Sequence, residues 1–258
     1  MKRWNSAVMI GAMILAPNVA RAGDLLSCSA GVNPFAATTV PAISVCVNNQ
    51  LHVFTGFSGT GKPYSLASVT RPLGTGASFT LSAIYNNDPF VSFTFSSTLV
   101  PGFGVVNFDV YLTTPVVGGG YTNASSAGTL SVTANGLNAN ALVTNGAYAS
   151  YISGYANATN LNVNTGSGPC SAATMGAATT ATTACNLPGA SSSFAPISPS
   201  LLSSRLSYAQ SAGSGSSTAS WTGIVNLTST TVPEPATLSL LFVGFLAVGA
   251  VRFRRGRS

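Results

Sequence analysis

The sequence predicts an all-β body: a single antiparallel β-sandwich or jelly-roll-like domain. Three observations support this fold class. Segments rich in Val, Phe, Thr and Tyr alternate polar and apolar residues with period two, as half-buried strands do. Turn-forming Asn, Asp, Pro and Gly residues separate these segments. The body, residues 23–231, carries no compelling amphipathic helix pattern and is long enough to enclose one sizeable core.

Period-two alternation predicts individual strands. The clearest hairpin joins residues 78–85 to residues 90–95 through the turn Asn86-Asn87-Asp88-Pro89. Another hairpin turns at Asn48-Asn49-Gln50. The further strands are residues 44–47, 51–54, 105–113, 128–133 and 221–228. Alternation places these residues of the 105–113 strand on one face: Val106, Phe108, Val110 and Leu112.

Stretches of biased composition predict loops between the strands. Residues 172–184 are mostly Ala and Thr, residues 191–200 are rich in Ser and Pro, and residues 211–220 are rich in Ser and Gly. The Asn-rich stretch 135–164 has no clean period, so it is not interpreted as a repeat solenoid.

The formal net charge of +6 belongs to the two ends of the chain. Within the body, three basic and three acidic residues cancel: Lys62, Arg71 and Arg205 against Asp24, Asp88 and Asp109. Neutralising phosphates requires clustered Lys and Arg, so a nucleic-acid partner is not expected. High hydrophobicity with few charges also argues against ordinary intrinsic disorder.

Residues 1–22 have the pattern of a secretory signal peptide. A basic start at Lys2-Arg3 precedes the apolar stretch 7–16, and Ala20-Arg21-Ala22 is a small-x-small site for signal peptidase. The alternative is a transmembrane helix. It is disfavoured because the apolar stretch would rise only about 15 Å, against a hydrocarbon core of about 30 Å. We therefore predict export and cleavage after Ala22.

Residues 232–258 have the pattern of a second targeting segment, which consists of three parts. The motif Pro233-Glu234-Pro235 keeps the chain extended, and the uncharged apolar stretch 236–251 can enter a bilayer as a short helix of about 24 Å. A basic cluster that stays cytoplasmic ends the chain: Arg252, Arg254, Arg255 and Arg257.

This tripartite tail resembles a PEP-CTERM sorting signal, and the resemblance is confined to residues 232–258. The resemblance implies export through the inner membrane, transient anchoring there by the C-terminal helix and processing near Pro233-Glu234-Pro235 by an exosortase-type protease. A final location at the cell surface or outside the cell would follow. Proteins with such tails are associated with exopolysaccharide and biofilm matrix. An ordinary single-pass anchor with stop-transfer arginines is the alternative.

The cysteines fit an oxidising compartment. Proximity favours the pairs Cys28–Cys46 and Cys170–Cys185, although four cysteines permit three connectivities. Each bridge would contribute about 3 kcal/mol by closing a short loop, and the second would restrain a loop with little core of its own. Zinc ligation is the alternative, but there is no Cys-x-x-Cys and His52 is the only histidine.

Catalytic chemistry is hard to assemble from these residues. The body contains Asp24, Asp88, Asp109 and no glutamate, which disfavours a paired-carboxylate hydrolase. A serine triad would need His52 as its base, but no Gly-x-Ser-x-Gly elbow exists and His52 fits a surface or edge position. A calcium site at Asn86-Asn87-Asp88 has one carboxylate, and turn chemistry already explains that sequence. No catalytic residue, cofactor or metal is expected.

Binding without catalysis is better supported. Tyr148, Tyr151 and Tyr155 could form a stacking platform for sugar rings, although ordinary packing is the simpler interpretation, as it is for Trp221. Two hypotheses follow. One is a non-enzymatic surface or extracellular-matrix protein associated with exopolysaccharide or with copies of itself. The alternative is a carbohydrate-binding module or carbohydrate-active enzyme on the same sorting signal.

Overall fold

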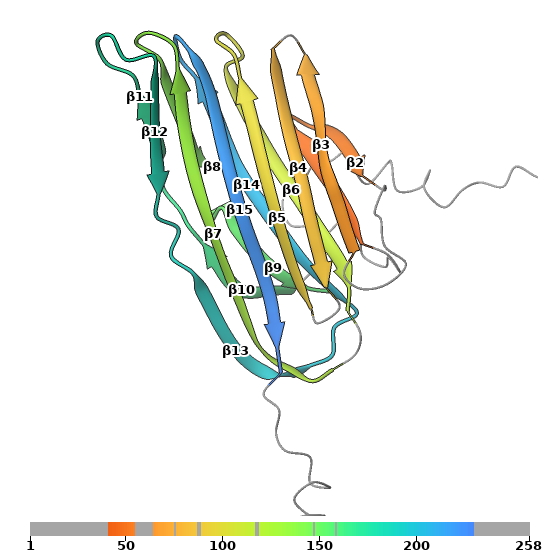
Figure 1. Cartoon of the computed structure of the whole chain (residues 1–258). Helices are drawn as coiled ribbons and strands as arrows, with labels where there is room; N and C mark the ends of the chain where they lie inside the picture. The colour runs from red at the N-terminus through yellow and green to blue at the C-terminus, as the bar shows by residue number, and fades with distance from the viewer. Residues whose placement is uncertain are drawn as a thin grey trace, which may run out of the picture.

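Two antiparallel sheets stacked face to face make up the described part of the chain (Figure 1). The computed structural model describes residues 41–54, 64–74, 76–86, 89–116, 119–146, 148–157 and 159–229. The predicted signal peptide and sorting tail lie outside these residues. Within them, no helix is long and apolar enough to cross a membrane. The all-β prediction is confirmed, and the arrangement is that of a β-sandwich.

Sheet A has eight strands and sheet B has seven. The strands of sheet A are β1 (Ala42–Val47), β2 (Gln50–Phe54), β6 (Val105–Pro115), β8 (Asn140–Asn145), β9 (Ile152–Ala156), β10 (Thr159–Thr165), β11 (Cys170–Ala173) and β14 (Leu201–Ala212). The strands of sheet B are β3 (Tyr64–Gly74), β4 (Ala77–Asn86), β5 (Phe90–Leu99), β7 (Tyr121–Asn135), β12 (Thr180–Cys185), β13 (Ala190–Ile197) and β15 (Ser216–Thr228).

Each sheet is built around long central strands. Sheet A runs β10-β9-β14-β6-β1-β2, and β8 continues it beside β14 and β11. Sheet B runs β12-β7-β15-β5-β4-β3, with β13 beside the other half of β7. In both sheets a long strand therefore pairs with two shorter strands, one after the other, along the same side.

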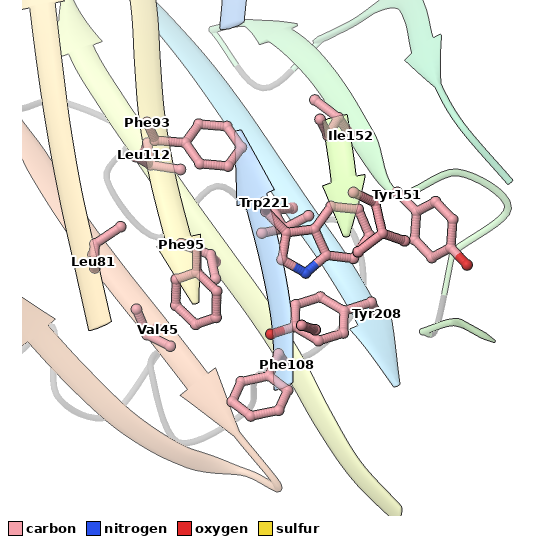
Figure 2. Close-up of a cluster of buried hydrophobic side chains, with 14 of the residues drawn as sticks. Val45, Leu81, Phe93, Phe95, Phe108, Leu112, Tyr151, Ile152, Tyr208 and Trp221 are labelled. Atoms are coloured by element: carbon pink, nitrogen blue, oxygen red, sulfur yellow. The ribbon is translucent and has the colours of Figure 1, made fainter. Parts of the chain in front are cut away.

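The core lies between the sheets and follows the alternation of the strands. The predicted apolar face of β6 is confirmed, because Val106, Phe108, Val110 and Leu112 are all at most 1% exposed. Figure 2 shows their aromatic neighbours: the Phe108 and Tyr208 rings stack with centroids 4.9 Å apart, and Tyr208 lies 4.9 Å from Trp221. Trp221 is 1% exposed, so it is a core residue, as the simpler interpretation had it.

The three predicted loops are wrong. Residues 172–184 include the end of β11 and most of β12, residues 191–200 include most of β13, and residues 211–220 include the end of β14 and the start of β15. Composition misled the prediction because Ser, Thr and Ala fill the exposed positions of these strands. Pairing with β7, β5 and β6 fixes their extended backbone, so tertiary context outweighs local composition.

Several strands gave no usable signal in the sequence: β3, β8, β9, β10, β11 and β14. The case of β14 is instructive. Its residues Leu201 to Gln210 are all buried. Because neither face of this part of the strand is exposed to solvent, the sequence does not have to alternate polar and apolar residues. The Asn-rich stretch 135–164 holds β8, β9 and most of β10, separated by turns rather than by repeats.

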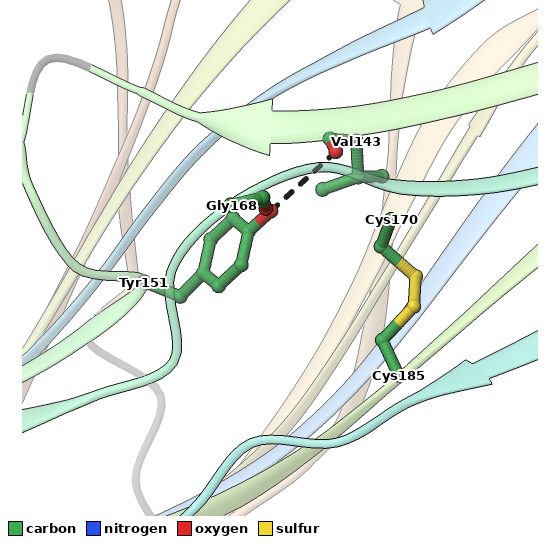
Figure 3. Close-up of a disulfide and its surroundings, with 5 residues drawn as sticks. All are labelled: Val143, Tyr151, Gly168, Cys170 and Cys185. Carbon is green, nitrogen blue, oxygen red and sulfur yellow. Dashed lines mark hydrogen bonds between the residues drawn. A yellow bond between two sulfur atoms is a disulfide. The ribbon is translucent and has the colours of Figure 1, made fainter.

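A disulfide links the two sheets. Cys170 of β11 in sheet A bonds to Cys185 of β12 in sheet B, with 6.0 Å between the Cα atoms (Figure 3). This confirms the predicted pair but corrects its role: the bond joins two strands across the sandwich instead of restraining a loop. Cys46 is disulfide-bonded as well, and its predicted partner Cys28 lies outside the described residues.

Candidate functional site

The outer face of sheet B is a regular array of hydroxyl groups. We call it the hydroxyl face and define it by three cross-strand rows of half-buried or exposed side chains. The first row is Thr182, Thr133, Thr218, Thr98 and Ser78. The second is Ser131, Ser220, Ser96, Thr80 and Thr70. The third is Thr129, Thr222, Thr94 and Ser82.

Alternation produces this face. In β15 the inward residues Ala219, Trp221 and Val225 are buried, while Thr218 and Thr222 point the other way. The same alternation holds in β4 and β5, so polar residues of three adjacent strands come into register.

Hydrogen bonds join neighbouring hydroxyls across the strands. The pairs are Thr129 with Thr222 at 2.7 Å, Ser82 with Thr94 at 2.6 Å, Thr70 with Thr80 at 2.9 Å, Thr133 with Thr182 at 2.9 Å, Thr98 with Thr218 at 3.3 Å and Ser96 with Ser220 at 3.5 Å. Each pair uses one of its two protons internally. The second hydroxyl keeps its proton, and both oxygens keep acceptor capacity for solvent or a ligand.

The three rows contain no charged side chain. Two exposed apolar residues adjoin them on the same face, Ile84 at 50% and Ile224 at 38% exposure, with Ser92 between them in register. A surface of spaced donors and acceptors with small apolar patches suits an uncharged, hydroxyl-rich partner. It has no group that would attract or repel ions selectively.

The outer face of sheet A differs, because it holds two of the three charged body residues that the structure describes, Arg205 and Asp109. We call Arg205, Asp109, Tyr111, Tyr148 and Tyr155 the arginine cluster. Arg205 on β14 lies opposite Tyr111 on β6, and Asp109 lies opposite Ser207. Arg205 is only 3% exposed and Asp109 9%. Both charged side chains are therefore largely removed from water. The loss of their hydration must be offset by contacts within the protein.

Aromatic faces provide part of that compensation. The Arg205 guanidinium carbon lies 3.0 Å from the Tyr148 ring centroid and 5.2 Å from that of Tyr155. The Tyr148 and Tyr111 hydroxyls are 3.2 Å apart. Nη2 of Arg205 donates to Ser153 Oγ at 3.5 Å, but its Nε has no hydrogen-bond partner. Oδ1 of Asp109 also has no partner.

Burial dominates the titration of this cluster. It raises the pKa of Asp109, while the Ser207 hydroxyl and the Arg205 charge act in the opposite direction. Burial also raises the pKa of Tyr155 and of Tyr111. The raised pKa values of Tyr111 and Tyr155 lie further from neutral pH, which makes these hydroxyls poorer proton-transfer groups there. The Asp109 carboxyl keeps its proton to a higher pH than an exposed aspartate does.

Two cavities are relevant here, and the first of them includes Asp109 of the arginine cluster. One, of about 250 Å³, is lined by Cys46, Asn48, Asn49, Asn107 and Asp109. The other, of about 370 Å³, is lined by Ala149, Ser150, Asn164, Gly166, Ser167, Asn186 and Pro188. Amides and a carboxyl in the first cavity could bind a polar ligand. Within the described residues no group of three or more His, Cys, Asp or Glu side chains could hold a metal ion.

The structure separates the three tyrosines suggested as a sugar platform. Tyr148 and Tyr155 flank Arg205 outside sheet A, as just described. Tyr151 is 1% exposed and lies in the core, 4.9 Å from Trp221. Its hydroxyl donates to the carbonyl oxygens of Gly168 and Val143 (Figure 3), and burial raises its pKa to about 12. Tyr151 is therefore a packing residue, which was the simpler interpretation.

His52 and Asp109 lie on opposite faces of sheet A. His52 sits on the edge strand β2, and its ring packs edge-on against Phe79 of sheet B at 5.4 Å, on the core side. Its pKa is lowered by burial and by the nearby Arg71 charge. Asp109 belongs to the outer face, so these two residues do not form a base–acid pair. Asp24 and Asp88, the other two candidate acids of the body, lie outside the described residues.

The similarity to a known protein family lies near the C-terminus of the chain. Residues 231–255 match the family model of the PEP-CTERM protein-sorting motif. The chain carries a PEP-CTERM tail. The match covers the predicted motif Pro233-Glu234-Pro235 and the first arginines of the basic cluster. A search of curated proteins found no match to the chain.

The PEP-CTERM tail implies export, sorting at the membrane and processing by an exosortase. It begins shortly after β15, which ends at Thr228. The tail could be recognised from sequence because its three parts are contiguous. The hydroxyl face could not, since its rows join residues as distant as Thr80 and Ser220, and only strand pairing brings these together.

Proposed function

We propose that the protein is an exported, non-enzymatic surface or extracellular-matrix protein whose β-sandwich associates with exopolysaccharide through the hydroxyl face. Its route begins with removal of residues 1–22 by signal peptidase. The PEP-CTERM tail then anchors it transiently in the inner membrane until an exosortase processes it for the cell surface or exterior. The PEP-CTERM tail supports export, and the hydroxyl face supports the choice of partner.

The observation that carries the proposal is the accessibility of uncharged hydroxyls in register over several strands. A polysaccharide chain also presents regularly spaced hydroxyls, and each contact exchanges hydrogen bonds with water for hydrogen bonds with protein, at a small net gain. Affinity would come from many weak contacts along one chain, as in other multivalent binding. The separation of His52 from Asp109 supports a role without catalysis.

The proposal is tested with the secreted protein and exopolysaccharide purified from the cells that produce it. The variant Thr94→Val, Thr129→Val, Thr222→Val removes hydroxyls of the third row while keeping side-chain shape and strand preference. We expect co-sedimentation with the polysaccharide to fall several-fold. The matched control is Thr144→Val, Thr159→Val, on strands β8 and β10 of sheet A.

Equal retention of the two variants would contradict the hydroxyl face as the binding surface. Turnover of the polysaccharide by the wild-type protein would contradict the non-enzymatic role. Sorting has a separate test: replacing Pro233-Glu234-Pro235 by alanines should leave a full-length, membrane-retained form. Release of this variant at the wild-type rate would contradict processing at the motif.

A second candidate function is a carbohydrate-binding module at the arginine cluster. It is favoured by the 250 Å³ cavity lined by Asp109, Asn48, Asn49 and Asn107 and by the aromatic rings of Tyr148 and Tyr155 beside Arg205. In that case Tyr155→Ala should abolish retention by the polysaccharide, whereas the third-row Thr→Val variant should retain it.

A further inference from the structure

Strand edges are the places where a β-sandwich meets other strands, because their backbone N–H and C=O groups lack partners. Proteins protect such edges with charges, prolines, bulges or very short strands. The described strands at the margins of the two sheets are β2, β10, β11, β3, β12 and β13. Five of them carry such protection.

In sheet B, β3 contains a register shift between Leu66 and Val69, followed by Arg71 and Pro72. Strand β13 contains a register shift between Ser193 and Ile197, with Pro196 inside it. These irregularities and prolines prevent continuous pairing with a further strand.

In sheet A, β10 is interrupted by a register shift between Asn160 and Asn164, and β11 has only four residues. Strand β2 has five residues, and the Arg71 guanidinium lies 5.5 Å from the ring of its last residue, Phe54. The margins of sheet A are therefore short, irregular or charged.

Strand β12 has none of these protections. Its six residues, Thr180–Cys185, pair with β7 in an unbroken register and include no charge and no proline. Figure 1 shows β12 at the margin of sheet B, with no strand of that sheet beyond it. Thr180, Thr182, Thr183 and Ala184 are exposed, so side chains on both faces of the strand are accessible. The inter-sheet disulfide at Cys185 fixes one end of the strand in place.

We propose that the β12 edge binds the β12 edge of a second copy of this chain, antiparallel and about a two-fold axis at Thr182. The occupant is a second copy because neither edge carries a charge, so identical copies do not repel each other. An axis normal to the sheet places Thr182 opposite Thr182 of the second copy, and Thr180 opposite its Ala184. Sheet B then continues across the pair.

This register extends the first row of the hydroxyl face. Thr133 and Thr182 already form a hydroxyl pair at 2.9 Å, and threonines opposite each other across strands are favourable neighbours. Two copies would present one continuous hydroxyl face. A six-residue edge buries little surface, so the pair forms reversibly at high local concentration. The inference needs no polysaccharide and thus goes beyond the proposed function.

The test introduces one thiol into the full secreted protein, whose described cysteines are all disulfide-bonded. With Thr182→Cys, mild oxidation should give a covalent dimer on a non-reducing gel at least several-fold faster than with Thr70→Cys, an exposed threonine on the protected edge β3. Equal rates for the two variants would overturn the proposal.

Sedimentation velocity supplies an independent readout without a thiol. The wild-type protein should show a dimer population that grows with concentration. Thr182→Lys should remove it, because two lysines would face each other at the axis, and Thr70→Lys should leave it unchanged. A wild-type protein that stays monomeric at millimolar concentration, or a dimer that survives Thr182→Lys, would overturn the proposal. Neither result would bear on polysaccharide binding.

Discussion

The outer faces of the two sheets are built by the same alternation but use polar residues in opposite ways. On sheet B the polar side chains are uncharged, accessible and only partly occupied by hydrogen bonds to each other. On sheet A the two charged side chains of the arginine cluster are buried, and tyrosine rings enclose Arg205. The comparison teaches that polar groups become a binding surface only when their hydrogen-bonding capacity remains accessible.

The largest expected effect comes from removing the central cation of the covered face. Arg205→Ala should destabilise the protein by about 2–4 kcal/mol, because it removes a desolvated cation from two aromatic rings and leaves Asp109 without a nearby positive charge. Chemical denaturation measures this. A loss below about 0.5 kcal/mol, the usual range for surface changes, would mean that the two faces do not differ in the way described.

A smaller, pH-dependent effect is expected at Asp109. Since burial raises its pKa, the charged carboxylate disfavours the folded state. The stability due to this group is complete below its usual value of 3.8 and is lost as the pH rises through the raised value. Asp109→Asn removes this dependence. Its melting temperature relative to wild type should therefore rise between pH 3 and pH 7. A difference that stays constant with pH, or falls, would contradict the assignment.

The smallest expected effect on stability lies on the open face. Thr222→Val should change the free energy of unfolding by no more than about 0.5 kcal/mol, since the hydroxyl can hydrogen-bond to water in either state and the side-chain shape is kept. Thermal unfolding of the variant beside Arg205→Ala measures the contrast directly. A loss of 2 kcal/mol or more would place Thr222 in a structural network instead of on a free surface.

The features that could be predicted from the sequence are those formed by residues close together in the chain. The alternation of residues 78–95 and 105–113 predicted β4, β5 and β6 closely, and the three contiguous parts of the tail predicted the PEP-CTERM motif. The turn at Asn48-Asn49 is also local: both residues have positive φ and close a two-residue hairpin between Val47 and Gln50.

The features that could not be predicted are those that depend on which strands pair with each other. Strand β12 has the composition of a linker, and only its register with β7 makes it a strand and an edge. Tyr151 and Tyr155 are four residues apart, a spacing that regular alternation would place on one face. Tyr151 instead lies in the bend before β9 (Ile152–Ala156), and its ring enters the core while that of Tyr155 lies beside Arg205. A pattern of aromatic spacing cannot state which face a side chain occupies until the pairing of the strand is known.

The central claim is that exopolysaccharide lies on the outer face of sheet B. The most direct measurement is the rate of thiol alkylation in two single-cysteine-addition variants, Thr222→Cys on the hydroxyl face and Thr144→Cys on sheet A, with and without the polysaccharide. The account predicts that polysaccharide slows alkylation of Thr222→Cys several-fold and leaves that of Thr144→Cys unchanged. Protection of Thr144→Cys alone, or of neither thiol under conditions where the protein is retained, would contradict it.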